Sequence, residues 1–134
     1  MSWLFRGQDG YSDLRRLLAR RQGGRCLICG RRLGPDAAMH HVIVARRHVA
    51  GWPKEQRSLI DHPCNVVLCC NEPCHLRDAH GEAGRYLIAW LIVQCGFDAI
   101  EAWVASLPWT LTPRWHRGLS AEEARDIVAK GVNI

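Results

Sequence analysis

Four of the seven cysteines in the chain stand in two closely spaced pairs. Cys26 and Cys29 are separated by two residues, and Cys70 and Cys74 by three. Two such pairs can supply four thiolates to a tetrahedral zinc ion. The number of cysteines is odd and no secretory signal is recognisable, so metal ligation is favoured over a framework of disulfides. The sequence therefore predicts a structural zinc site.

Cys69 precedes Cys70 directly, which leaves two candidates for one zinc ligand. Adjacent residues of a strand point to opposite faces, so only one of the two can face the metal beside Cys74. We favour Cys70. Cys64, Cys95 and the neighbour that does not bind zinc are expected to be small buried apolar residues.

Histidines that could act in catalysis lie between and directly after the cysteine pairs. His40 and His41 are adjacent in a predicted strand, Asn65 precedes a second apolar run, and His75 follows Cys74. Because neighbouring strand residues face apart, His40 and His41 cannot both ligate one ion, and we expect them to divide the work. An imidazole can take a proton from water near neutral pH. An asparagine amide can hold a loop backbone through both its donor and its acceptor.

The order of these residues resembles the HNH nuclease family: a cysteine knuckle, a His-His pair on a strand, an asparagine before a second strand, and a Cys-His on a helix. The resemblance covers about residues 12–80. It implies a ββα-metal fold that cleaves DNA with Mg²⁺ or another divalent ion, separate from the structural Zn²⁺. It also implies His40 and His75 as ligands of the catalytic ion, His41 as general base, and Asn65 as the residue that holds the loop presenting the base. The spacing of the second cysteine pair departs from the usual two residues.

Basic residues outnumber acidic ones by 18 to 13, giving a formal net charge of +5, and most of them are arginines. Guanidinium groups suit phosphate oxygens, and a basic surface favours an anionic partner. We expect DNA as the partner, with Arg46, Arg47 and Arg77 as candidate contacts. The resemblance also implies an origin in a phage or mobile element, which makes phage packaging or replication proteins candidate partners.

Hydrophobic periodicity predicts the elements that position these residues. We expect a helix over residues 13–22 capped by Ser12, strands over 39–44 and 66–68, and a helix that begins at Cys74. Residues 45–60 should form a long loop with room for a helical turn. Apolar residues at helical spacing predict helices over residues 82–93 and 97–107. Ser120 and Glu123 form a capping box that predicts the start of a last helix.

These elements predict an α+β fold with a ββα-metal core and flanking helices at both ends. We expect residues 1–81 to form the N-terminal helix and a core stabilised by zinc. Residues 82–134 should form a helical extension packed on the same domain. The longest apolar run, Tyr86 to Val93, is too short to span a bilayer. We therefore expect no membrane association and a cytoplasmic location.

Further residues are candidates for metal or nucleic-acid binding. His80 is a candidate third ligand, and Trp109, Arg114, Trp115 and Arg117 are candidates for nucleic-acid contact. We expect the remaining histidines on the surface: His48, His62 and His116.

Two other functions fit the same residues. One is a non-catalytic zinc module that binds nucleic acid. The other is a zinc-dependent hydrolase acting on other substrates, for which Asp61 is the nearby acidic candidate for the base.

Overall fold

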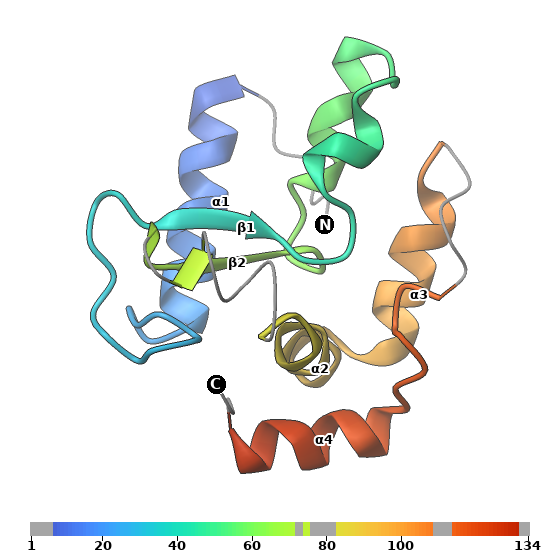
Figure 1. Ribbon diagram of the computed structural model, residues 1–134. Coiled ribbons are helices and arrows are strands. Elements are labelled where there is room, and N and C mark those ends of the chain that lie inside the picture. The colour runs from blue at the N-terminus through green and yellow to red at the C-terminus, as the bar shows by residue number, and fades with distance from the viewer. Residues whose placement is uncertain (1–6, 72–73, 76–82, 109–113, 132–134) are drawn as a thin grey trace.

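The computed structural model describes residues 7–71, 74–75, 83–108 and 114–131. It contains helices and a two-stranded antiparallel sheet, as the predicted α+β class requires (Figure 1). In chain order the elements are α1 (Gly7–Arg21), β1 (Ala38–His41), the 3₁₀ helices η1 (Arg46–Val49) and η2 (Lys54–Ile60), β2 (Val66–Cys69), α2 (Gly84–Cys95), α3 (Phe97–Ser106) and α4 (Ala121–Lys130).

The sheet pairs β1 with β2 so that Ala38 lies opposite Cys69 and His41 opposite Val66. The first strand ends at His41, three residues before the predicted end at Val44. The reason lies in its hydrogen bonds: the backbone amides of Ile43 and Val44 donate to the Asn65 side chain instead of to a partner strand. The chain therefore leaves the sheet directly after the histidine pair.

Helix α1 packs against β2 and covers the outer edge of that strand. It begins at Gly7, so the prediction of Ser12 as its cap was wrong; serine costs a helix interior little, and Ser12 stays exposed. At the other end, the Gln22 side chain donates to the Leu68 carbonyl at 2.7 Å and accepts from the Leu68 amide at 2.7 Å. Arg21 donates to the Val66 carbonyl at 2.8 Å. These side chains satisfy the strand edge that would otherwise be open.

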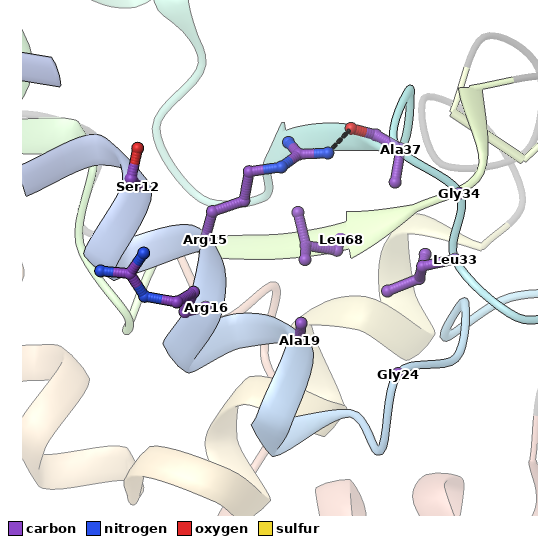
Figure 2. A pocket seen from close by; sticks show the side chains of 9 residues that line it. All are labelled: Ser12, Arg15, Arg16, Ala19, Gly24, Leu33, Gly34, Ala37 and Leu68. Atoms are coloured by element: carbon purple, nitrogen blue, oxygen red, sulfur yellow. Dashed lines mark hydrogen bonds between the residues drawn. The ribbon is translucent and has the colours of Figure 1, made fainter. Parts of the chain in front are cut away.

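A second link joins α1 to the segment that leads into β1 (Figure 2). The guanidinium of Arg15 donates to the Ala37 carbonyl at 2.7 Å. A shallow groove of about 380 Å³ runs between the two, with Leu33 and Leu68 among its lining residues. Beneath it, Leu14 and Leu18 of α1 form a small core with Val66 and Leu68. The position of β1 is thus fixed by α1 as well as by β2.

Residues 45–60 are more ordered than the predicted loop, because they form η1 and η2. Apolar residues anchor both turns: Val49, Trp52 and Ile60 are buried. The guanidinium of Arg57 donates to the carbonyls of Trp52, at 3.1 Å, and Ala50, at 3.2 Å. This segment is therefore a folded part of the core region.

The three predicted C-terminal helices are present. Helix α2 lies at the centre of the molecule with α4 packed against it (Figure 1). The predicted capping box is confirmed: the Glu123 amide donates to Ser120 Oγ at 3.1 Å, and the Ser120 amide donates to Glu123 Oε1 at 3.4 Å. Trp115 is buried and its indole donates to Glu101 at 2.6 Å. The prediction that Trp115 contacts nucleic acid was therefore wrong. Trp109 lies outside the described residues.

Among the residues that the structure describes, no single helix has the length and apolar character needed to cross a membrane. Helices α2 and α3 meet these criteria of length and apolar character only when they are taken together, and the pair is bent by 101°.

Candidate functional site

The four predicted zinc ligands come together in one cluster. The Sγ atoms of Cys26, Cys29, Cys70 and Cys74 all lie within 4.8 Å of one another, and those of Cys29 and Cys70 are 3.6 Å apart. Four sulfurs each about 2.3 Å from a common zinc ion would lie at separations of this order. Cys69, by contrast, is completely buried in the core. The cluster can therefore hold a metal ion, and it includes Cys70, the neighbour that we favoured from the sequence.

The backbone around Cys26 is shaped to present sulfur to a metal. The Cys26 amide donates to the Arg31 carbonyl at 2.8 Å, and Gly30, at a φ of 77°, donates back to the Cys26 carbonyl at 3.0 Å. The amides of Ile28 and Cys70 each lie 3.4 Å from Cys26 Sγ. Amide donors directed at a thiolate stabilise its charge and orient it toward the ion.

The second cysteine pair, Cys70 and Cys74, accommodates its extra intervening residue in a widened turn. The His75 amide donates to the Cys70 carbonyl at 3.0 Å, five residues back in the chain. A turn of this width is one residue longer than an α-helical turn. It brings Cys74 back to the cluster although three residues separate it from Cys70. The predicted helix beyond His75 lies outside the described residues.

Arg31 supplies positive charge to the outer side of the cluster. Its Nε lies 3.4 Å from Cys29 Sγ, and its Nη2 lies 3.8 Å from Cys70 Sγ. Burial acts to raise the pKa of Cys29, but the hydrogen bonds from Arg31 outweigh it and lower that pKa to about 6. Burial, with hydrogen bonds from the neighbouring thiols, raises the pKa of Cys74. A dication offers the compensation that four neighbouring thiolates require, and thiolate sulfur suits zinc.

A cavity of about 410 Å³ lies beside the sheet, and the predicted histidines share it. Its lining includes His40, His41 and His75. The rings of His40 and His75 lie edge to face, with centroids 5.2 Å apart and planes at 67°. The two imidazoles are therefore close neighbours on the wall of one cavity. Within the described ranges, only the cysteine cluster gathers three or more ligand side chains.

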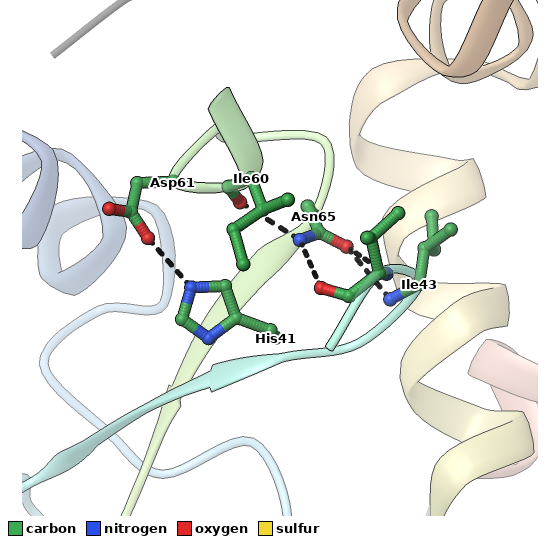
Figure 3. Close-up of polar contacts among 6 residues, drawn as sticks. His41, Ile43, Ile60, Asp61 and Asn65 are labelled. Carbon is green, nitrogen blue, oxygen red and sulfur yellow. Dashed lines mark hydrogen bonds and ion pairs between the residues drawn. The ribbon is translucent and has the colours of Figure 1, made fainter. Parts of the chain in front are cut away.

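His41 has a different partner (Figure 3). Its Nε2 lies 2.7 Å from Oδ1 of Asp61, and both side chains are largely buried. A carboxylate can only accept, so Nε2–H is the donor and Nδ1 is the nitrogen that can take up a proton. From the sequence alone, Asp61 was a candidate only for the base of the alternative hydrolase. The sequence clue to this role was the position of Asp61 four residues before Asn65, the residue expected to hold the loop that presents the base.

Asn65 fastens the segments on both sides of this pair (Figure 3). Its Oδ1 accepts from the amides of Ile43 and Val44, each at 2.8 Å. Its Nδ2 donates to the carbonyls of Val44, at 3.0 Å, and Ile60, at 2.8 Å. Asn65 is completely buried. It therefore ties the chain just after His41 to the chain just before Asp61.

Basic side chains surround the cavity. Arg46 and Arg47 are exposed and belong to its lining. Arg46 also lines an adjoining groove of about 530 Å³, together with Lys54, Arg57 and Asp61. Lys54 and Arg57 were not predicted as part of the site, because residues 45–60 were expected to form a long loop. Arg77 and His80 lie outside the described residues.

His62 is buried, so its prediction as a surface residue was wrong. Its ring stacks on Trp103 of α3, with centroids 5.1 Å apart and planes at 21°. Its Nδ1 accepts from the Cys64 amide at 3.0 Å. Burial lowers the pKa of His62 to about 4, which keeps the ring neutral at physiological pH. His62 is thus part of the scaffold behind the site.

Comparisons of the chain with protein-family models, with curated proteins and with solved structures give no significant match.

Proposed function

We propose that the protein is a metal-dependent endonuclease of the HNH type that hydrolyses phosphodiester bonds in DNA. The observation that carries the proposal is the meeting of His40, His41 and His75 at one cavity whose lining also includes Arg46 and Arg47. Hydrolysis of a phosphodiester needs a base for the attacking water and positive charge at the phosphate. This cavity offers groups of both kinds.

His41 is the general base in this proposal. Its Nε2–H is engaged by Asp61, which leaves Nδ1 to accept the proton of an attacking water. The Asp61 carboxylate holds the ring and offsets the positive charge that the imidazole gains. Asn65 fixes the backbone on both sides of the pair, through Val44 and Ile60, so the geometry is set before substrate binds.

His40 and His75 would hold the catalytic ion. Such an ion, when bound, supplies charge that stabilises the leaving oxygen of the cleaved ester. Two imidazoles favour a transition-metal ion such as Ni²⁺ over Mg²⁺, which prefers oxygen ligands. The cysteine cluster would be purely structural, because four protein sulfurs complete the coordination of zinc and leave no position for substrate.

Arg46 and Arg47 would bind the phosphate next to the cleaved bond. Lys54 and Arg57 continue the positive charge along the adjoining groove. Because these groups are exposed, their attraction for a nucleic-acid backbone should weaken as salt rises.

The test is nicking of supercoiled plasmid by zinc-loaded protein. We expect activity with Mn²⁺ or Ni²⁺ and none with a limited excess of EDTA that leaves the cysteine-bound zinc in place, as metal analysis would verify. His40→Ala and His75→Ala should require more metal, whereas His48→Ala, which alters an exposed histidine, should match wild type. A folded, zinc-loaded protein that binds DNA but nicks it with none of these ions would instead be the non-catalytic binding module.

A further inference from the structure

A second pair of cysteines lies outside the zinc cluster. Cys64 is buried directly before Asn65, and Cys95 is the half-buried last residue of α2. Although the two are far apart in sequence, they lie close enough for a hydrogen bond between their thiols to shift the pKa of each. The sulfur of Cys95 also lies 3.7 Å from the carbonyl oxygen of Pro63. Folding therefore brings together two thiols that have no part in the zinc cluster or the histidine cavity.

The guanidinium of Arg21 is fixed beside this pair. Its Nη1 donates to the Pro63 carbonyl at 2.9 Å and lies 3.8 Å from Cys95 Sγ. Its Nη2 donates to the Val66 carbonyl at 2.8 Å, and its Cζ sits 4.9 Å from the centroid of the Trp90 ring. These contacts hold a permanent cation against the Cys95 sulfur. A cation in this position stabilises the thiolate, which is the nucleophilic form of cysteine.

The two thiols have opposite acid–base properties. The hydrogen bond from Cys64, together with the charge of Arg21, lowers the pKa of Cys95 to about 7, although burial opposes this. The same hydrogen bond and burial raise the pKa of Cys64. Cys95 is also the more exposed of the two. Cys95 is therefore suited to attack an external disulfide, and Cys64 to resolve the product.

We propose that Cys64 and Cys95 form a reversible disulfide by exchange with a low-molecular-weight disulfide of the glutathione type. The Cys95 thiolate attacks one sulfur of glutathione disulfide, forms a mixed disulfide and releases one glutathione thiolate. Cys64 gives up its proton and attacks the Cys95 sulfur, which breaks the mixed disulfide and releases the second glutathione. Two protein thiols are oxidised, one glutathione disulfide is reduced to two thiols, and the two cysteine protons end on glutathione.

The disulfide would join the segment that carries Asn65 to the end of α2. It closes a loop of the chain that contains β2 and most of α2. Closing such a loop restricts the unfolded chain, so oxidation should raise the melting temperature by several degrees. This inference does not depend on the proposed nuclease activity.

The experiment is equilibration of zinc-loaded protein in glutathione buffers of increasing oxidised fraction, followed by alkylation and peptide mapping. Cys95 is the only cysteine between Tyr86 and Arg114, so its tryptic peptide reports on one thiol. We expect this peptide to become linked to the one that contains Cys64, with the zinc retained. Cys64→Ser should stop at a glutathione adduct on Cys95, Cys95→Ser should abolish the link, and Cys69→Ala should leave the transition unchanged.

Two results would overturn the inference. One is alkylation of both thiols across all buffers in folded, zinc-loaded wild-type protein. The other is disulfides confined to the zinc-cluster cysteines, with release of zinc. The tryptic peptide 58–77 contains Cys69, Cys70 and Cys74 as well as Cys64, so fragmentation of the linked wild-type peptide is needed to place the bond at Cys64. This assignment in wild type keeps the test valid even if a serine variant fails to fold.

Discussion

Nε2 of His41 lies 2.7 Å from Oδ1 of Asp61, and the pair joins the end of β1 to the end of η2. The link depends on Asn65, whose amide bonds the backbone beside each partner, at Val44 and at Ile60. A buried asparagine thus sets the distance between a histidine and a carboxylate that lie on different elements.

Asp61→Asn tests the contribution of the carboxylate charge. The amide keeps an acceptor for Nε2–H but cannot offset the charge on a protonated ring, so we expect nicking to fall on the order of 10- to 100-fold. Zinc content, melting temperature and DNA affinity should stay near wild type. Glu55→Gln, which alters an exposed carboxylate at the start of η2, is the matched control. Equal nicking rates for the two variants would remove Asp61 from the mechanism.

Exchange of the adjacent cysteines tests the zinc site. We expect about one zinc per chain in wild type and in Cys69→Ala, since Cys69 lies in the core. Cys70→Ser should lose most of the zinc and show a sharp fall in melting temperature, because metal binding is coupled to folding. Metal analysis and thermal denaturation give the two readouts. Retention of zinc by Cys70→Ser together with its loss from Cys69→Ala would reverse the assignment.

Asn65→Ala should destabilise the fold by about 3 kcal/mol or more. The change leaves four buried backbone partners at Ile43, Val44 and Ile60 without the amide that satisfies them. Denaturant unfolding measures the loss. Asn71→Ala removes an exposed asparagine amide and should cost little by comparison. Similar stabilities for the two variants would contradict the structural role of Asn65.

His62 should make the protein sensitive to mild acid. Burial lowers its pKa in the folded state to about 4, below the unfolded value of about 6.5. Its stabilising contribution is therefore complete above pH 6.5 and is lost as the pH falls toward 4; between pH 7.5 and 5.5 the loss should be about 1 kcal/mol. In His62→Asn this part of the pH dependence should vanish. Urea unfolding of both proteins at the two pH values is the measurement, and parallel changes in unfolding free energy would refute it.

Local rules predicted much of the zinc site and of the helices. Strand alternation showed that only one of Cys69 and Cys70 can face the metal, and the Ser120–Glu123 capping box marked the start of α4, because each depends on residues close in sequence. The same rules placed His40 and His41 on a strand.

Tertiary contacts decided what the sequence did not show. The early end of β1 depends on Asn65, which lies on the far side of η1 and η2. The burial of His62 depends on Trp103 from α3, and the His41–Asp61 pair depends on η2, which places Asp61 at its C-terminal end. None of these contacts leaves a periodic pattern in the sequence.

The central claim is tested most directly by the nicking rate of His41→Ala, measured beside wild type at saturating Mn²⁺ or Ni²⁺. A general base acts only in the chemical step, so the rate should fall by ~10²–10⁴-fold. Zinc content, melting temperature and DNA affinity should remain close to wild type. Nicking by His41→Ala at the wild-type rate would contradict the account.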